Sequence, residues 1–359
     1  MLYAILWIVS IPIWAFLVHS LYMSDEKKKE ILFIILTIEL CLIGGLRDFD
    51  TFNDSKSYSL HFYTVSDSGN FYEVPKERFE RGYLIFEKFI HKYVSHHYSA
   101  LFMIISAFTI GTAMYFFYKK SRWLWLTVFL YVGMRCYFIQ IQAVRQSIAM
   151  ALLLIAFLLF ERRKRIMSVL MVFLASTFHS TAIVGLCIFP LFFIPLNKKS
   201  VLWFVFVAFL GIFSLANILN LLGYGDSTYL TDEGMQLGNV ISVVCYVTLM
   251  VYVWWTGSKQ LIDENRMLVW GSMLCVICSI VALIVTAFNR VADYFSYYAF
   301  LLLPNVMYAN KHKKLHALIV FILVISMYIG ILTLKPNWNK AFPYYFFWER
   351  HDTRYISIY

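Results

Sequence analysis

The sequence predicts an all-helical integral membrane protein that crosses the bilayer about twelve times. Of its 359 residues, 61% are hydrophobic and only 14% are charged. Soluble domains contain about 45–50% apolar and about 25% charged residues. The mean hydropathy is +0.68, and long apolar runs alternate with short polar connections. This composition excludes a water-soluble enzyme, a disordered chain and a disulfide scaffold.

The positions of the basic residues predict the topology. More than half of the 31 Lys and Arg residues lie in six short connections between apolar runs. Because cytoplasmic loops are enriched in Lys and Arg, we assign all six connections to the cytoplasm. An even number of crossings must then separate successive connections, which predicts twelve spans with both chain ends outside. The basic connections are Lys27–Lys29, Lys119–Arg122, Arg162–Arg165, Lys198–Lys199, Lys259–Arg266 and Lys311–Lys314.

The spans follow in chain order. Residues 1–23 are expected to form a retained first span, because they have neither a basic start nor a small-residue cleavage site. One span follows Lys314. Between them lie five pairs of spans, at residues 31–118, 123–160, 166–197, 200–258 and 267–310.

Two of these pairs are tight for spans of about 17–25 residues, and the first leaves about 17 residues for each helix. The pair at 123–160 turns near Gln140 to Arg145, and the pair at 166–197 turns near Phe178 to Ser180. The second pair leaves about 15 residues for each helix, which cover only about 22 Å. We expect short or broken helices here that hold polar backbone around a cavity. Re-entrant hairpins are the alternative.

The remaining polar segments are assigned to the external side of one membrane domain, residues 1–359. They comprise a long external loop at 47–97, an external loop at 223–238 and an external C-terminal tail at 335–359. Within the first loop, residues 81–94 are amphipathic and are expected to lie at the membrane interface. The aromatic residues of the first loop and the tail favour membrane interfaces, and they also stack on sugar rings.

Three arginines, Arg135, Arg145 and Arg290, lie within or at the external ends of apolar spans. The positive-inside rule disfavours arginine on that side. A charge at membrane depth costs at least about 2.5–3.5 kcal/mol, so these positions require a reason. Converging guanidinium groups can bind a phosphate through forked hydrogen bonds. An internal ion pair, for example between Arg290 and Asp293, is the alternative for each. Arg135 and Arg145 would share one face if a helix continued between them.

Candidates for proton transfer lie on the same side. His179 interrupts an apolar run, and a histidine in this position is either a packing residue or a proton acceptor. The first-loop carboxylates Asp48, Asp50 and Asp54 could bind a hard cation. They lack the glycine and glutamate of an EF-hand loop, so no metal is expected. The charges between residues 77 and 88 are expected to pair mostly within a helix.

The sequence contains no Walker loop, dinucleotide fingerprint or GxSxG elbow. No nucleotide is available outside the cytoplasm, so chemistry there requires a substrate that carries its own leaving group. A lipid pyrophosphate meets this requirement, because it is anionic and resides in the membrane.

Five motifs, taken in order over nearly the whole chain, resemble the EpsG-type branch of the Wzy polysaccharide polymerases. The first motif departs from its relatives, which often read R-x-x-x-V-G-x-D. Here the residues from Arg47 read Arg-Asp-Phe-Asp-Thr without that glycine. The aspartates of this loop therefore do not align simply with the aspartate of the relatives' motif. The motifs are Gly45-Leu-Arg-x-x-Asp50-Thr-x-x-Asp54-x-x-x-Tyr58, Glu80-Arg-Gly82-Tyr83, Val-Arg145-Gln146-Ser-Ile-Ala149, Phe178-His179-Ser-Thr-Ala, and Arg290 followed by Tyr294.

The resemblance implies a metal-independent, inverting glycosyltransferase of the polytopic GT-C type in the bacterial inner membrane. Its active site would face the periplasm or the cell exterior. It would move a glycan from undecaprenyl pyrophosphate onto the terminal sugar of a lipid-linked repeat unit. The product would be O-antigen of lipopolysaccharide, capsule or exopolysaccharide. A flippase and a chain-length regulator would be its partners, and neither a cofactor nor nucleic acid is expected.

The resemblance also gives roles to the candidate residues. The pyrophosphate ligands would be Arg145 and Arg290, supported by Arg47 and Arg135. The base would be His179 or, as second choice, Asp50. Substrate-supporting residues would be Asp54, Tyr58, Glu80, Gln146 and Tyr294.

Two other classes of protein remain as alternatives. A transporter or flippase of a lipid-linked anionic glycan could use the same arginines without chemistry, although the sequence lacks the inverted repeat of many transporters. A membrane acyltransferase would also use an external His and Arg, but it needs a path for a cytoplasmic acyl donor.

Overall fold

The computed structural model describes residues 2–66, 79–221, 237–334, 341 and 343–349. Throughout these residues the secondary structure is helical, apart from an isolated antiparallel bridge between Arg47 and Phe346. The all-helical class predicted from the sequence is therefore confirmed. Most of the predicted external loop 223–238 and of the tail 335–359 lies outside the described residues.

The chain divides into two compact units, which we call the first unit (Met1–Ala182 and Lys314–Tyr359) and the second unit (Ile183–Lys313). The single membrane domain over residues 1–359 stays a prediction. The helices of the first unit are α1 (Leu2–Ser20), α2 (Asp25–Gly45), α3 (Ser55–Ser66), α4 (Arg81–Tyr93), α5 (Tyr98–Lys120), α6 (Leu124–Gly133), α7 (Cys136–Gln142), α8 (Val144–Glu161), α9 (Arg165–Phe178) and, after the second unit, α16 (Lys313–Leu334). A 3-10 helix, η1 (Ser180–Cys187), leads to the helices of the second unit: α10 (Ile188–Leu191), α11 (Lys198–Leu221), α12 (Leu237–Thr256), α13 (Lys259–Glu264), α14 (Arg266–Val281) and α15 (Phe288–Tyr308).

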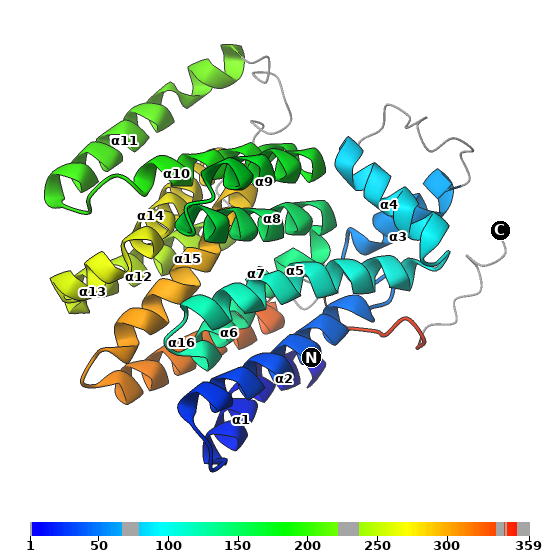
Figure 1. The fold of residues 1–359 in the computed structure, drawn as a ribbon, viewed down its shortest axis with the longest axis horizontal. Coiled ribbons are helices and arrows are strands. Elements are labelled where there is room, and N and C mark those ends of the chain that lie inside the picture. Colours follow the sequence, from blue (N-terminus) through cyan, green and yellow to red (C-terminus); the bar gives the residue numbers. More distant parts are fainter. Residues whose placement is uncertain (1, 67–78, 222–236, 335–340, 342, 350–359) are drawn as a thin grey trace. The chain divides into compact units, whose positions relative to one another are not determined.

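The core of the first unit is a row of helices in which α2 packs on α5, α5 on α8, and α8 on α9 (Figure 1). Small residues bring α2 and α5 close together. A Cβ atom added at Gly45 would lie 2.9 Å from the Cα of Met103, so only glycine fits there. Nearby, the Ser106 hydroxyl donates to the carbonyl oxygen of Cys41 at 2.9 Å. Close packing of small residues and interhelical hydrogen bonds are what associate helices in lipid.

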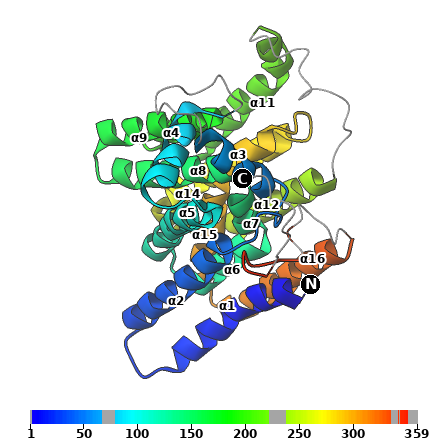
Figure 2. The same ribbon diagram turned by 90° about the vertical axis from the view of Figure 1, so that its right-hand side faces the viewer.

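The N-terminal helices form a hairpin, with α1 and α2 joined by a short turn at residues 21–24 (Figure 2). The described part of the predicted tail returns to the end of this hairpin. The Tyr344 hydroxyl donates to the carbonyl oxygen of Ile43, and the Asp48 amide donates to the carbonyl oxygen of Tyr345 at 2.9 Å. The start of the first loop and the tail are therefore in contact.

Four of the described helices, α5, α8, α12 and α16, are long and apolar enough to cross a membrane. A fifth span results if α6 and α7, which meet at a bend of 60°, are counted as one. The chain is thus a polytopic helical membrane protein. The total of twelve spans stays a prediction.

The two tight pairs of spans turn where the sequence predicts, and the second pair contains the predicted short helices. In the first pair, α7 ends at Gln142 and α8 begins at Val144, within the predicted turn. In the second pair, α9 has 14 residues and ends at Phe178, and a 3-10 helix follows. A shared helical face for Arg135 and Arg145 is wrong, because the chain leaves the helix at Ala143.

The second unit is held by buried amides in addition to apolar packing. Asn305 on α15 donates to the side-chain oxygen of Asn265 at 3.0 Å. Asn239 on α12 donates to the carbonyl oxygen of Ala282 at 3.0 Å and accepts from Asn289 at 2.7 Å. These hydrogen bonds satisfy polar groups that are buried between the helices.

Candidate functional site

Four predicted site residues, one from each of the first four motifs, meet at one end of the first unit. We call Tyr58 on α3, Glu80 before α4, Arg145 in the first turn of α8 and His179 after α9 the Glu80 cluster. Arg145 forms an ion pair with one carboxylate oxygen of Glu80, and its Nε donates to the Tyr58 hydroxyl at 3.3 Å. The second oxygen of Glu80 lies 3.2 Å from Nδ1 of His179 and accepts from the amide of Ser180 at 3.2 Å.

The glycine of the second motif explains how α4 comes this close to the end of α9. A Cβ atom added at Gly82 would lie 2.7 Å from the backbone oxygen of Thr177. Real Cβ atoms do not approach so closely, so only glycine fits at this crossing. Because Gly82 follows Glu80 by two residues, this contact brings the carboxylate to His179.

An aromatic side chain that the sequence analysis missed lies beneath the arginine. The guanidinium carbon of Arg145 is 4.5 Å from the ring centre of Phe79. Phe79 also stacks on the ring of Tyr58, with 5.5 Å between the centroids. A cation over an aromatic face is stabilised by the ring quadrupole. In the sequence, Phe79 is notable only because it precedes Glu80. That position does not show that its ring contacts Arg145.

The cluster holds Glu80 in its ionised form. Burial alone would raise the pKa of this carboxyl, but the hydrogen bond from His179 and the charge of Arg145 lower it to about 2. Because a carboxylate only accepts hydrogen bonds, Nδ1 of His179 must carry the proton that it donates. The other ring nitrogen, Nε2, is buried and has no hydrogen-bond partner among the described residues.

A second carboxylate, Glu87, lies about two turns further along α4 than Glu80. It is buried, and its two oxygens contact Nδ1 of His61 at 2.7 Å and the hydroxyl of Tyr83 at 3.3 Å. The sequence predicts that charges in this region pair mostly within a helix. That interpretation is wrong for Glu80, whose ionic partners lie on α8 and after α9.

Arg47, predicted as a supporting phosphate ligand, is buried with an exposed fraction of 2%. Its guanidinium donates to the carbonyl oxygens of Gly44 and Ile141, the latter at 3.1 Å, and its Nε donates to the hydroxyl of Ser55 at 3.1 Å. The group also lies 3.8 Å from the ring centre of Phe102. These contacts favour a structural role, in which Arg47 joins the end of α2 to α3 and α7.

Asp48 and Asp54 take part in the fold of the first loop, Asp48 through its carboxylate and Asp54 through its backbone. Asp48 is buried and accepts from the amide of Asp50 at 2.9 Å. The carbonyl oxygen of Asp54 accepts from the amide of Tyr58 at 3.1 Å, at the start of α3. Within the described residues, no group of three or more His, Cys, Asp or Glu side chains could hold a metal ion. The roles predicted for Asp50 and Asp54 stay predictions.

The remaining candidates lie outside the Glu80 cluster. Arg135 is half-buried at the break between α6 and α7, with a left-handed φ of 70°. Gln146, next to Arg145, is buried in α8. Arg290 is exposed in the first turn of α15, and Tyr294 is buried one turn later, both in the second unit. Their roles as ligands also stay predictions.

The fold and the cluster define a polytopic helical membrane protein with a half-buried Glu–His–Arg constellation at the ends of its helices. Comparison with known families gives the next step. The EpsG family matches residues 30–346, which include all five motifs, and the chain belongs to this family. Neither a curated protein nor a solved structure matches the chain.

Proposed function

We propose that this protein is a polysaccharide polymerase that moves a glycan from undecaprenyl pyrophosphate onto the terminal sugar of a lipid-linked repeat unit. Membership of the EpsG family supports a polymerase-like membrane enzyme. The observation that carries the proposal is the pairing of Glu80 with both Arg145 and His179. This arrangement combines a cation for a leaving group with an oriented base, which the reaction needs together.

In the proposed reaction, the acceptor hydroxyl attacks the anomeric carbon of the donor sugar. The bond between that carbon and the pyrophosphate oxygen breaks, and undecaprenyl pyrophosphate leaves with the electron pair. Nε2 of His179 takes the proton of the hydroxyl. Glu80 fixes the tautomer that leaves Nε2 unprotonated and stabilises the imidazolium that forms, as carboxylates do in other His-based sites.

Arg145 would compensate the charge that develops on the pyrophosphate. It lies in the first turn of α8, where the helix dipole also favours an anion. Stabilisation of developing charge by fixed groups is usually the largest catalytic effect.

We propose Arg290 as a second ligand of the pyrophosphate, because the positive-inside rule disfavours an arginine at its position. Arg135 is proposed as a supporting ligand. Asp50 is the alternative base.

We further propose twelve crossings, a GT-C-like fold, and an active site on the periplasmic or external side of the bacterial inner membrane. Each of the five predicted pairs of spans contains two or more helices, and the first and last predicted spans contain α1 and α16. In the first unit, the Glu80 cluster lies where α8 begins and α9 ends, whereas the basic residues 162–165 lie where α8 ends and α9 begins. Reporter fusions after Lys29, Lys120, Arg165, Lys199, Arg266 and Lys314 should all report cytoplasm, and two or more external reports would contradict this topology.

A cell-free assay tests the reaction. Purified protein is mixed with a lipid-linked repeat unit, and the products are separated by size. A polymerase yields a ladder of longer glycans, whereas a transporter or flippase yields none and an acyltransferase changes the mass without lengthening the glycan. A flippase and a chain-length regulator, which we propose as partners in the cell, are not needed for this assay.

A matched pair of variants tests whether polymerisation in this assay depends on the Glu80 cluster. Glu80→Gln removes the carboxylate from the cluster, while Glu161→Gln removes one at the other end of α8, where it pairs with Lys120 at 2.5 Å. We expect Glu80→Gln to abolish the ladder and Glu161→Gln to retain it. A ladder of normal length from Glu80→Gln would contradict the proposed site.

A further inference from the structure

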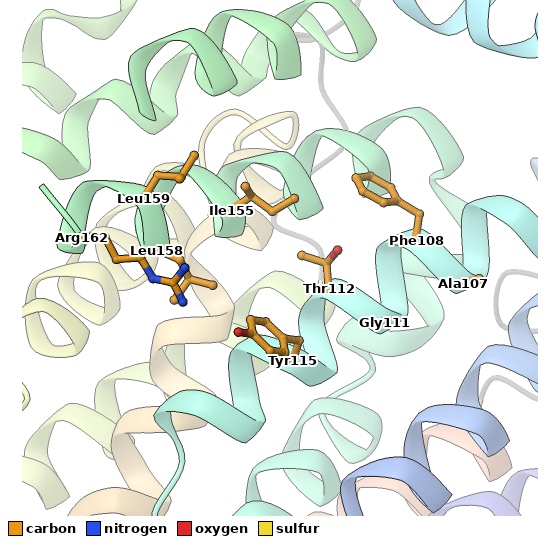
Figure 3. Close-up of a pocket in the computed structure, with 9 residues that line it drawn as sticks. All are labelled: Ala107, Phe108, Gly111, Thr112, Tyr115, Ile155, Leu158, Leu159 and Arg162. Carbon is orange, nitrogen blue, oxygen red and sulfur yellow. The ribbon is translucent and has the colours of Figure 1, made fainter. Parts of the chain in front are cut away.

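A groove with a volume of about 410 Å³ lies between α5 and α8 in the first unit (Figure 3). Both helices are long and apolar enough to cross a membrane. One wall is formed by residues of α5 from Ala107 to Tyr115, and the other by α8 from Ile155 to Leu159. Arg162, just past the end of α8, lies at one end of the groove and Phe108 toward the other.

A glycine keeps the groove open. Gly111 lies at the middle of the wall formed by α5, and no atom lies within 4 Å of the place where its Cβ would be. The neighbouring Phe108 and Tyr115 are exposed, at 37% and 38%. An apolar, open groove between two helices that can cross a membrane favours lipid over water, because water gains no hydrogen bonds there.

The end of the groove near Arg162 carries positive charge. Arg162 is exposed, and the ammonium group of Lys119 lies 5.5 Å from the ring centre of Tyr115. The acidic residue at this end, Glu161, is engaged in an ion pair with Lys120. The hydroxyl of Tyr115 points toward the end where Arg162 lies (Figure 3). This end therefore offers two cations and a hydroxyl to an anion.

We propose that the groove binds a phospholipid with a net negative headgroup, whose acyl chain lies along Gly111 and whose phosphate contacts Arg162. The apolar walls suit the acyl chain, and the cationic end suits the phosphate. Two neighbouring cations favour an anionic headgroup over a zwitterionic one, because they repel the ammonium of the latter. The site lies at the end of α8 opposite Arg145, and it does not depend on the proposed reaction.

Lipid retention measured by mass spectrometry tests this site. The purified protein is equilibrated with detergent micelles that contain equal amounts of phosphatidylglycerol and phosphatidylcholine, and the lipids that stay bound are counted. We expect the protein to prefer phosphatidylglycerol. Arg162→Gln should reduce that preference about fivefold, as expected for loss of one cation near a headgroup. Lys164→Gln, in the same basic connection but outside the groove, should leave the preference unchanged.

A second pair of variants tests the apolar part. Gly111→Leu fills the groove and should reduce the bound lipid of both kinds. Gly330→Leu on α16 adds the same side chain at another position with open space around it, and serves as the control. Equal retention of phosphatidylglycerol by the wild type, Arg162→Gln and Gly111→Leu would overturn the proposal. So would equal losses in Gly111→Leu and Gly330→Leu.

Discussion

Glu80 and His179 are 99 residues apart in the sequence, yet the carboxylate of one lies 3.2 Å from Nδ1 of the other. The contact joins the start of α4, in the loop predicted to be external, to the end of α9. It orients the imidazole so that Nε2 is left without a partner among the described residues. The packing of α4 on α9 is therefore what turns two weak sequence motifs into a candidate acid–base pair.

The first prediction separates the two nitrogens of His179. In His179→Asn, the side-chain amide occupies the place of Nδ1 and keeps a donor for Glu80, but nothing replaces Nε2. We expect a folded protein whose polymerisation rate falls at least about 100-fold, the usual contribution of a general base. Rates from the cell-free assay and binding of the lipid-linked donor are the measurements.

His179→Ala serves as the comparison, because it removes both nitrogens. It should lose polymerisation to the same degree and some stability in addition. If His179→Asn polymerises at the wild-type rate, Nε2 is not the base, and Asp50→Asn is the next variant to test.

The second prediction concerns the pH dependence of stability. The pKa of Glu80 is lowered from 4.5 to about 2 in the folded protein, so its ionised form stabilises the fold. That contribution is complete above pH 4.5 and is lost as the pH falls through about 2. We expect the melting temperature of the wild type to fall more steeply with acid than that of Glu80→Gln.

Glu161→Gln is the control for this measurement, since it leaves the cluster intact and should keep the steep dependence of the wild type. Parallel curves for the wild type and Glu80→Gln would mean that Glu80 does not hold a lowered pKa.

The sequence predicted individual residues of this site better than their contacts. The breaks at Gln142 and Phe178 follow from polar residues inside apolar runs too short for two full spans, a property that is local. The pairing of Glu80 with Arg145 and His179 depends on how α4 packs against α8 and α9, and no local pattern encodes that. The break at Arg135 was also missed, because the apolar run continues through it.

The third prediction tests the close crossing of α4 and α9. Gly82→Ala adds a Cβ that would lie 2.7 Å from the backbone oxygen of Thr177. Because backbone cannot yield as a side chain can, α4 must move away, which costs about 1–3 kcal/mol. We expect lower thermal stability and a loss of polymerisation. Gly330→Ala, which adds a Cβ in open space, should change neither the melting temperature nor the glycan ladder. Normal activity of Gly82→Ala would show that the contact between Glu80 and His179 does not need this glycine.

The last prediction distinguishes Arg145, predicted as a pyrophosphate ligand, from Arg47, predicted to support it. Arg47 is buried and donates to the carbonyl oxygens of Gly44 and Ile141, so its loss leaves buried acceptors unpaired. We expect Arg47→Ala to cost at least about 2 kcal/mol of stability and to reduce the amount of folded protein. Arg145 is half-buried and paired with Glu80 at the helix ends. Arg145→Ala should fold at near-normal levels but lose about 100-fold or more in rate, the usual effect of removing a fixed donor to a developing anion.

Arg145→Lys refines this comparison, because it keeps the charge but loses the planar fork that can contact Glu80, Tyr58 and a phosphate at once. Its rate should fall between those of the wild type and Arg145→Ala. Folded protein is measured by size-exclusion chromatography and activity by the glycan ladder, so each arginine is scored on both. If Arg145→Ala is well folded and builds long glycan, Arg145 is structural and Arg290 becomes the main candidate for the pyrophosphate. If Arg47→Ala folds normally and loses only activity, the buried contacts of Arg47 do not hold the fold, and its predicted role as a phosphate ligand regains support.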